Sequence, residues 1–137
     1  MAEQHYEGGC HCGALRYGVD LDLEKGTVRC NCSLCSKSRA WFAFTAADKF
    51  QLQGGDDHIH YRWTPPNRET PNLTYHICST CGVRTHANGK DPKGNDIVAV
   101  QVATLEGADP ASLAKGILYV DGRHDRFDRE PEHIDAL

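Results

Sequence analysis

Three closely spaced cysteines, Cys30, Cys32 and Cys35, have the residue type and spacing to do chemistry. A Cys-x-Cys-x-x-Cys run on a tight turn can place three thiolates around one cation. Zinc with three protein ligands keeps its fourth tetrahedral position open, which is the arrangement of a reactive site rather than a purely structural one. The sequence therefore predicts that these three residues form the catalytic centre.

The four remaining cysteines have the number that a closed structural zinc site needs: Cys10, Cys12, Cys78 and Cys81. Glycine follows the second cysteine of each pair, at Gly13 and Gly82 in the sequence, and glycine tolerates the positive φ of a chain that folds back sharply. We expect two facing hairpin tips that hold one zinc ion. The binding free energy of that ion would contribute directly to folding.

Two other arrangements of the cysteine ligands are open at this point. The pair Cys32/Cys35 could join Cys78/Cys81 in a zinc ribbon, which would leave the other three cysteines as an odd trio. Alternatively, a histidine could close the three-cysteine site as its fourth ligand. The candidates for that role are His11, His58, His60, His76 and His86.

An open three-thiolate zinc favours sulfur chemistry. Three thiolates leave the unit with a charge of about −1, so bound water is acidified less than at a three-histidine zinc, where its pKa falls to about 7. A thiolate-rich site instead suits an incoming sulfur ligand, bound as the nucleophilic thiolate. Lys37 and Arg39 follow the third cysteine and are candidates to hold a carboxylate of that thiol compound.

Hydrolysis by zinc-bound water is a further hypothesis. It requires a general base close to the metal. The sequence offers Glu69, His76 and Asp121 as candidates for that role.

Composition limits the class of protein. The 137 residues fit one domain spanning 1–137, with 15 basic and 19 acidic side chains and a net charge of −4. That balance argues against a nucleic-acid or anionic-membrane partner, and no run approaches the roughly 20 apolar residues of a membrane span. The first residues lack the features of a signal peptide, and an odd cysteine count suits a reducing compartment. We expect a cytoplasmic protein.

The elements that must position these cysteines are short strands separated by turn signals, typical of a mainly-β domain. Strands are expected at 6–10, 14–19, 27–29, 41–44, 50–52, 58–63, 73–77, 83–87, 97–104 and 118–120. Single helical turns are expected at 33–38, capped by Ser33, at 46–49 and at 109–113. Residues 64–71 and 88–95 read as an exposed loop and a long turn. The charged tail from about residue 124 is expected to be loose.

Three cysteine motifs and a later glycine-containing motif resemble a known family. They are Gly9-Cys10-His11-Cys12-Gly13-Ala14-Leu15-Arg16-Tyr17, Cys30-Asn31-Cys32-Ser33-Leu34-Cys35, Cys78-Ser79-Thr80-Cys81-Gly82 and Tyr119-Val120-Asp121-Gly122-Arg123. In this order they are similar to the glutathione-dependent formaldehyde-activating enzymes, a family that also includes centromere protein V.

The resemblance implies a Mss4-like zinc-binding β domain of short antiparallel strands. It implies one structural zinc on Cys10, Cys12, Cys78 and Cys81 and a more labile, catalytic zinc on the other three cysteines. It also implies carbon–sulfur lyase chemistry, in which glutathione and formaldehyde combine reversibly to S-hydroxymethylglutathione. The expected partner is thus a small thiol such as glutathione.

The alternative to an enzyme is a non-enzymatic zinc module that binds a protein partner. An exposed aromatic patch would favour that function. Its members would be Trp41, Phe44, Tyr61 and Trp63, whose simpler interpretation is that they fill the core.

Overall fold

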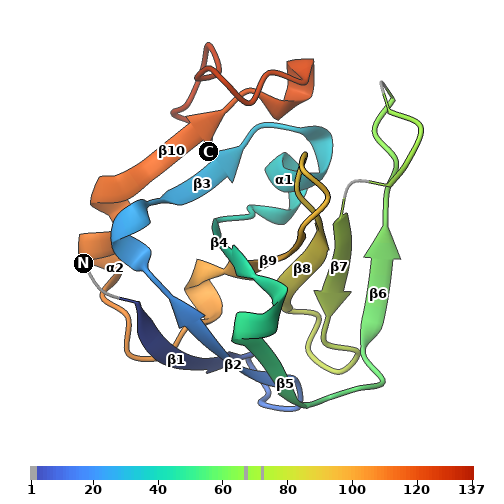
Figure 1. The fold of residues 1–137 in the computed structure, drawn as a ribbon, viewed down its shortest axis with the longest axis vertical. Coiled ribbons are helices and arrows are strands. Elements are labelled where there is room, and N and C mark those ends of the chain that lie inside the picture. The colour runs from blue at the N-terminus through green and yellow to red at the C-terminus, as the bar shows by residue number, and fades with distance from the viewer. Residues whose placement is uncertain (1–2, 67, 72) are drawn as a thin grey trace.

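The chain folds into ten strands in two sheets, as the computed structural model shows for residues 3–66, 68–71 and 73–137 (Figure 1). The strands are β1 (Gln4–Gly9), β2 (Arg16–Leu21), β3 (Thr27–Cys30), β4 (Phe42–Ala46), β5 (Phe50–Gly54), β6 (Ile59–Arg62), β7 (Leu73–Ile77), β8 (Arg84–Lys90), β9 (Asp96–Gln101) and β10 (Ile117–Val120). Two short helices, α1 (Ser33–Ser38) and α2 (Pro110–Leu113), accompany them. The predicted mainly-β class is confirmed.

The smaller sheet is antiparallel and has the order β1-β2-β5. The larger sheet has the order β10-β3-β4-β9-β8-β7-β6. Its strands are antiparallel, as expected, except for β10, which pairs with β3 in parallel. A parallel pair needs a long crossover connection. Here the remaining strands of the larger sheet supply that connection between Cys30 and Ile117.

The core lies on both faces of the larger sheet. Between the two sheets, Tyr17 and Val19 of β2 pack with Val98 and Val100 of β9. On the opposite face, a second cluster contains Phe42, Tyr75, Ala87, Ala99, Cys35 of α1 and its N-cap Cys32. Strand β9 is therefore buried on both sides, which explains its nearly continuous hydrophobic sequence and confirms the central strand expected there.

Most expected strand boundaries differ from the structure by one or two residues, and the ends of β8 and β9 differ by three. Residues 88–90 continue β8 rather than starting a turn, and Lys90 pairs with Asp96 in the antiparallel ladder. The turn begins at Asp91, whose Oδ1 accepts hydrogen bonds from the backbone N–H groups of Lys93 and Asn95, each at 2.9 Å. The strand expected at 97–104 ends at Gln101 and is followed by a 3₁₀ turn at Val102–Thr104. Among the described residues, no helix is long and apolar enough to span a membrane.

Candidate metal centres and the adjoining cavity

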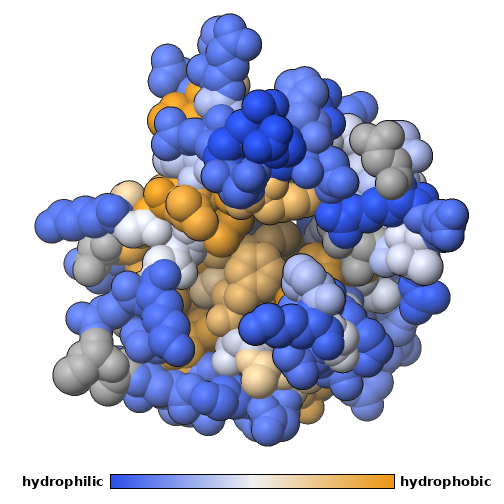
Figure 2. Space-filling model, turned by 45° about the horizontal axis from the view of Figure 1, so that its top comes forward, coloured by the Kyte–Doolittle hydropathy of each residue, from blue (hydrophilic) through white to orange (hydrophobic). Residues whose placement is uncertain are grey.

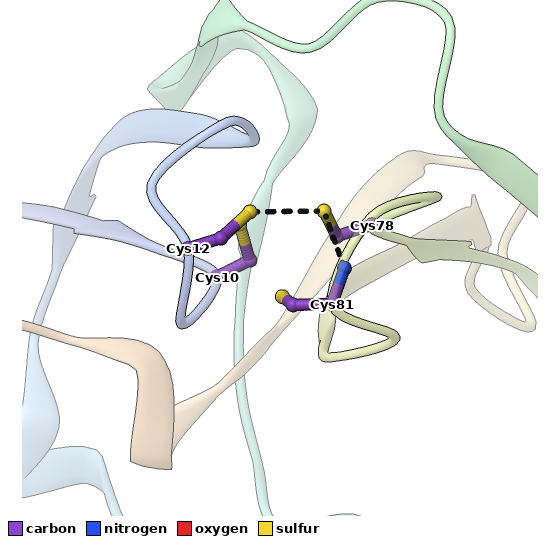
Figure 3. A group of neighbouring side chains, drawn as sticks. All are labelled: Cys10, Cys12, Cys78 and Cys81. Carbon is purple, nitrogen blue, oxygen red and sulfur yellow. Dashed lines mark hydrogen bonds between the residues drawn. The ribbon is translucent and has the colours of Figure 1, made fainter.

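Two hairpin tips bring four cysteines together. The Sγ atoms of Cys10, Cys12, Cys78 and Cys81 all lie within 4.8 Å of one another, and Figure 3 shows the two pairs pointing toward a common centre. The tips turn back at Gly13 and Gly82, with φ of 86° and 79°. These are positive φ values of the kind that glycine adopts without steric cost.

The geometry of this group fits a tetrahedral zinc ion. The Sγ of Cys12 lies 3.6 Å from the Sγ atoms of Cys10 and Cys78. Zinc–sulfur bonds of about 2.3 Å in a tetrahedron place sulfurs about 3.8 Å apart. Backbone N–H groups of Cys81 and Thr80 point at the Cys78 sulfur and lower the pKa of that thiol. Stabilised thiolates are the form that a metal ligand needs.

The second cysteine group surrounds the start of α1. Cys30 ends β3, and the Sγ atoms of Cys30, Cys32 and Cys35 also lie within 4.8 Å of one another. The helix cap expected at Ser33 is instead Cys32, whose Sγ accepts from the backbone N–H of Cys35 at 3.3 Å. The Sγ of Cys30 accepts from the N–H of Cys32 at 3.4 Å. A thiolate can thus cap this helix in place of a hydroxyl.

These contacts shift the pKa values of the Cys32 and Cys35 thiols in opposite directions. Hydrogen bonds from the thiols of Cys30 and Cys35 lower the pKa of Cys32 to about 3, and backbone N–H groups add to that effect. The same sulfur contacts, together with burial, raise the pKa of Cys35. These contacts therefore favour the thiolate form at Cys32 over Cys35. A cation at the centre would favour the same form in all three.

The two other ligand arrangements do not match the geometry. Cys32 and Cys35 lie with Cys30 and not with Cys78 and Cys81, so the cysteines divide four and three. Within the described ranges, the group around Cys35 contains no histidine. Of the five histidines considered, His58, His60 and His76 form a separate cluster, and His86 stacks on His76 at a centroid distance of 4.2 Å.

A largely apolar cavity of about 310 Å³ opens beside the trio, and all three cysteines line it. Its walls include Val28, Phe42, Tyr75 and Val120. Figure 2 shows hydrophobic residues gathered in a hollow that hydrophilic residues surround. A cavity of this volume and lining suits a small organic ligand.

The cations at this cavity are not the ones expected from the sequence. Lys37 and Arg39 do not line it, and Arg39 instead faces a small recess beside Arg29 and Leu137. Arg68 and Arg123 line the cavity. Arg68 donates to the Oδ1 of Asp125 at 2.9 Å and comes from the expected loop at 64–71, of which residue 67 lies outside the described residues. Sequence reasoning missed both arginines, because only the fold brings their loops to the trio.

Asp121 anchors the segment that carries Arg123. Its buried carboxylate accepts from Asn31 Nδ2 at 2.9 Å and also from His124 and Arg129. These hydrogen bonds, led by that from Asn31, lower its pKa to about 2. Asn31 lies between two cysteines of the trio, and its Oδ1 accepts from the N–H of Arg123 at 2.9 Å. The Asp121–Asn31 pair thus couples the metal turn to the cavity wall.

The candidate general bases for hydrolysis lie elsewhere or are engaged. The carboxylate of Asp121 accepts hydrogen bonds from three side chains. Glu69 is exposed and does not line the cavity. His76 belongs to the separate histidine cluster. Among the described residues that line the cavity, Asp125 is the one acidic residue, and its carboxylate forms an ion pair with Arg68. The site offers no unengaged carboxylate for water activation among these residues.

The four aromatic residues considered as a patch do not share one surface role. Trp41 is half-buried, and its indole N–H donates to Thr27 Oγ1 at 2.7 Å. Phe44 and Tyr61 are exposed. Phe44 also lines the cavity, together with Trp63. Two of the four, Phe44 and Trp63, therefore belong to the cavity lining.

Comparison with known proteins agrees with this geometry. A family model described as glutathione-dependent formaldehyde-activating enzyme matches residues 5–119. The chain belongs to this family. The predicted family resemblance is thus confirmed. A crystal structure of a Rhodobacter sphaeroides protein is also similar, with 27% sequence identity, a TM-score of 0.66 and coverage of 83% of this chain and 99% of that one.

Proposed function

We propose that this protein is a zinc-dependent enzyme of the carbon–sulfur lyase type, which acts on S-hydroxymethylglutathione, the adduct of glutathione and formaldehyde. In the direction of synthesis, the sulfur of glutathione forms a bond to the formaldehyde carbon. The carbon–oxygen π pair moves to oxygen, which gains a proton, while the thiol loses one. Cleavage is the reverse, so no oxidant or reductant is needed.

The observation that carries this proposal is the open side of the trio. The Sγ atoms of Cys30, Cys32 and Cys35 lie within 4.8 Å of one another, and no fourth ligand joins this group among the described residues. When bound there, zinc supplies a soft cation that holds a substrate sulfur as its thiolate. We assign the labile, catalytic zinc to this trio and a structural zinc to Cys10, Cys12, Cys78 and Cys81.

The chain's own residues contribute binding and proton transfer. Arg123 and Arg68, the latter also paired with Asp125, lie at the cavity, where their guanidinium groups can receive the carboxylates at the two ends of glutathione. The apolar wall excludes water from the reacting carbon. The phenol of Tyr75 is protonated at neutral pH, and burial raises its pKa further. Tyr75 lines the same cavity as the trio and is the candidate donor to the product oxygen.

Two cysteine variants test the assignment. Cys32→Ser should reduce bound zinc from two ions per chain to one, abolish acceleration of adduct formation and leave the fold intact. Cys78→Ser should instead lower the melting temperature strongly, because the closed site links two distant hairpins. Zinc content, thermal melts and exchange NMR of glutathione with formaldehyde measure these effects. Full activity in folded Cys32→Ser protein would refute the proposal.

A further inference from the structure

Four histidines form a compact cluster away from both cysteine groups. His60, His76 and His86 are direct cross-strand neighbours on β6, β7 and β8, so their side chains share one face of the larger sheet. His58 precedes β6, and its ring centroid lies 4.6 Å from that of His60 and 4.8 Å from that of His76. Strand alternation places this face opposite Tyr75, which lines the catalytic cavity.

The hydrogen bonds of two of these rings fix where their lone pairs point. Nδ1 of His58 faces the carbonyl oxygen of Gly55, which can only accept, so this nitrogen carries the proton. Nε2 of His76 lies 2.5 Å from Oδ1 of Asn88 and donates to it. Each neutral ring therefore has one remaining nitrogen with a lone pair. Those two nitrogens, His58 Nε2 and His76 Nδ1, lie only 2.6 Å apart.

Two lone pairs at that distance repel each other unless a proton or a metal cation lies between the two nitrogens. The surroundings match those of metal-binding histidines, whose second ring nitrogen usually donates to a carbonyl or a comparable acceptor. Gly55 and Asn88 supply those acceptors here. A ring nitrogen of His60 lies within 4.8 Å of the other two and completes a set of three.

We propose that His58, His60 and His76 form a third metal site, which takes a first-row divalent ion that favours imidazole, such as Ni²⁺ or Cu²⁺. Tetrahedral bonds of about 2.05 Å place ligand nitrogens about 3.3 Å apart, so the two close rings need to separate by about 0.7 Å. His60 is exposed and His58 and His76 are half-buried, which leaves a path for the ion.

The fourth histidine supports the site without binding the ion. His86 is buried, stacks on His76 with an interplanar angle of 4° and packs against Phe50 at a centroid distance of 4.4 Å. Its Nδ1 lies 2.8 Å from Thr85 Oγ1. His86 therefore holds the His76 ring from behind and fixes its plane.

The test is a titration of full-length, zinc-loaded protein with Ni²⁺. Long-range ¹H–¹⁵N NMR spectra of the histidine rings report where the paramagnetic ion lies, and calorimetry reports how many ions bind. We expect the ring signals of His58, His60 and His76, with neighbouring His86, to disappear at one equivalent, while His5 and His133 keep theirs. The zinc content should stay unchanged, which excludes exchange at the cysteines.

Two variants and one control make the assignment specific. His60→Gln removes an exposed ligand and should weaken Ni²⁺ binding by about 100-fold, the upper end of the cost of losing even an outer-shell partner. His58→Gln/His60→Gln should abolish it. His133→Gln, whose side chain is 85% exposed in the tail, should bind as the wild type does. The proposal would be overturned if Ni²⁺ broadened the ring signals of all histidines according to their exposure, or if the double variant bound Ni²⁺ as tightly as the wild type. The short contact between His58 and His76 would then be explained by a shared proton.

Discussion

The Sγ of Cys30 lies directly against Gly122, so that a methyl group on Gly122 would stand 2.3 Å from that sulfur. Gly122 lines the cavity beside the three cysteines, and the preceding Asp121 accepts a hydrogen bond from Asn31. The motif Tyr119–Arg123 therefore packs against the turn that carries the three cysteines, although about 90 residues separate the two segments in sequence.

Gly122→Ala should weaken zinc binding at the trio by about 10- to 100-fold, because the added methyl group displaces the Cys30 sulfur. The measurement is competition with a chromophoric chelator. Gly116→Ala is the matched control, since its methyl group would lie at an ordinary 3.6 Å from the nearest atom. Equal zinc affinities in the two variants would contradict this role of Gly122.

Arg68→Gln and Arg123→Gln should each raise KM for glutathione by about fivefold with little change in kcat, since a partly exposed ion pair with a carboxylate contributes up to about 1 kcal/mol. The effect should shrink at high salt. Arg126→Gln is the control, because Arg126 is paired with Asp128 outside the cavity lining. A fall in kcat alone would argue against carboxylate binding.

Tyr75→Phe should lower kcat by about 100-fold and leave KM for glutathione nearly unchanged, because it removes a proton donor and keeps the ring that lines the cavity. Steady-state kinetics separates the two constants, and zinc content checks that the trio is intact. Tyr61→Phe, at an exposed position, provides the control. Wild-type kcat in the Tyr75 variant would exclude the hydroxyl from the reaction.

The free energy of unfolding should fall at alkaline pH, because the buried Tyr17 resists ionisation in the folded state. Burial raises the pKa of Tyr17 to about 12, above its ordinary value of 10.0. The unfolded chain therefore loses this proton first, and stability falls as pH rises from about 10 to about 12. Tyr17→Phe loses the 2.6 Å hydrogen bond to Thr104 and should be about 1 kcal/mol less stable at pH 7.

The stability difference between wild type and Tyr17→Phe should then narrow above pH 10, since phenylalanine has no proton to lose. Urea unfolding at a series of pH values gives this difference directly. A difference that stays constant or grows above pH 10 would show that Tyr17 ionises as easily in the folded state as in the unfolded one.

Local spacing was enough to predict the cysteine groups and most strands. Gly13 and Gly82 identified the two hairpin tips, and the hydrophobic run in β9 identified the central strand. The parallel pairing of β10 with β3 could not be read locally, because it depends on the path of the whole larger sheet. The same holds for Arg68 and Arg123, whose cavity positions arise from long-range packing.

The central claim is that a substrate sulfur completes the three-cysteine metal site, and cobalt-substituted protein tests it most directly. Thiolate-to-cobalt charge-transfer absorption should increase by the contribution of one sulfur when glutathione is added, and not with S-methylglutathione, which has no free thiol. Cys32→Ser protein should show no such increase. An unchanged spectrum at saturating glutathione, with the trio loaded, would contradict the account.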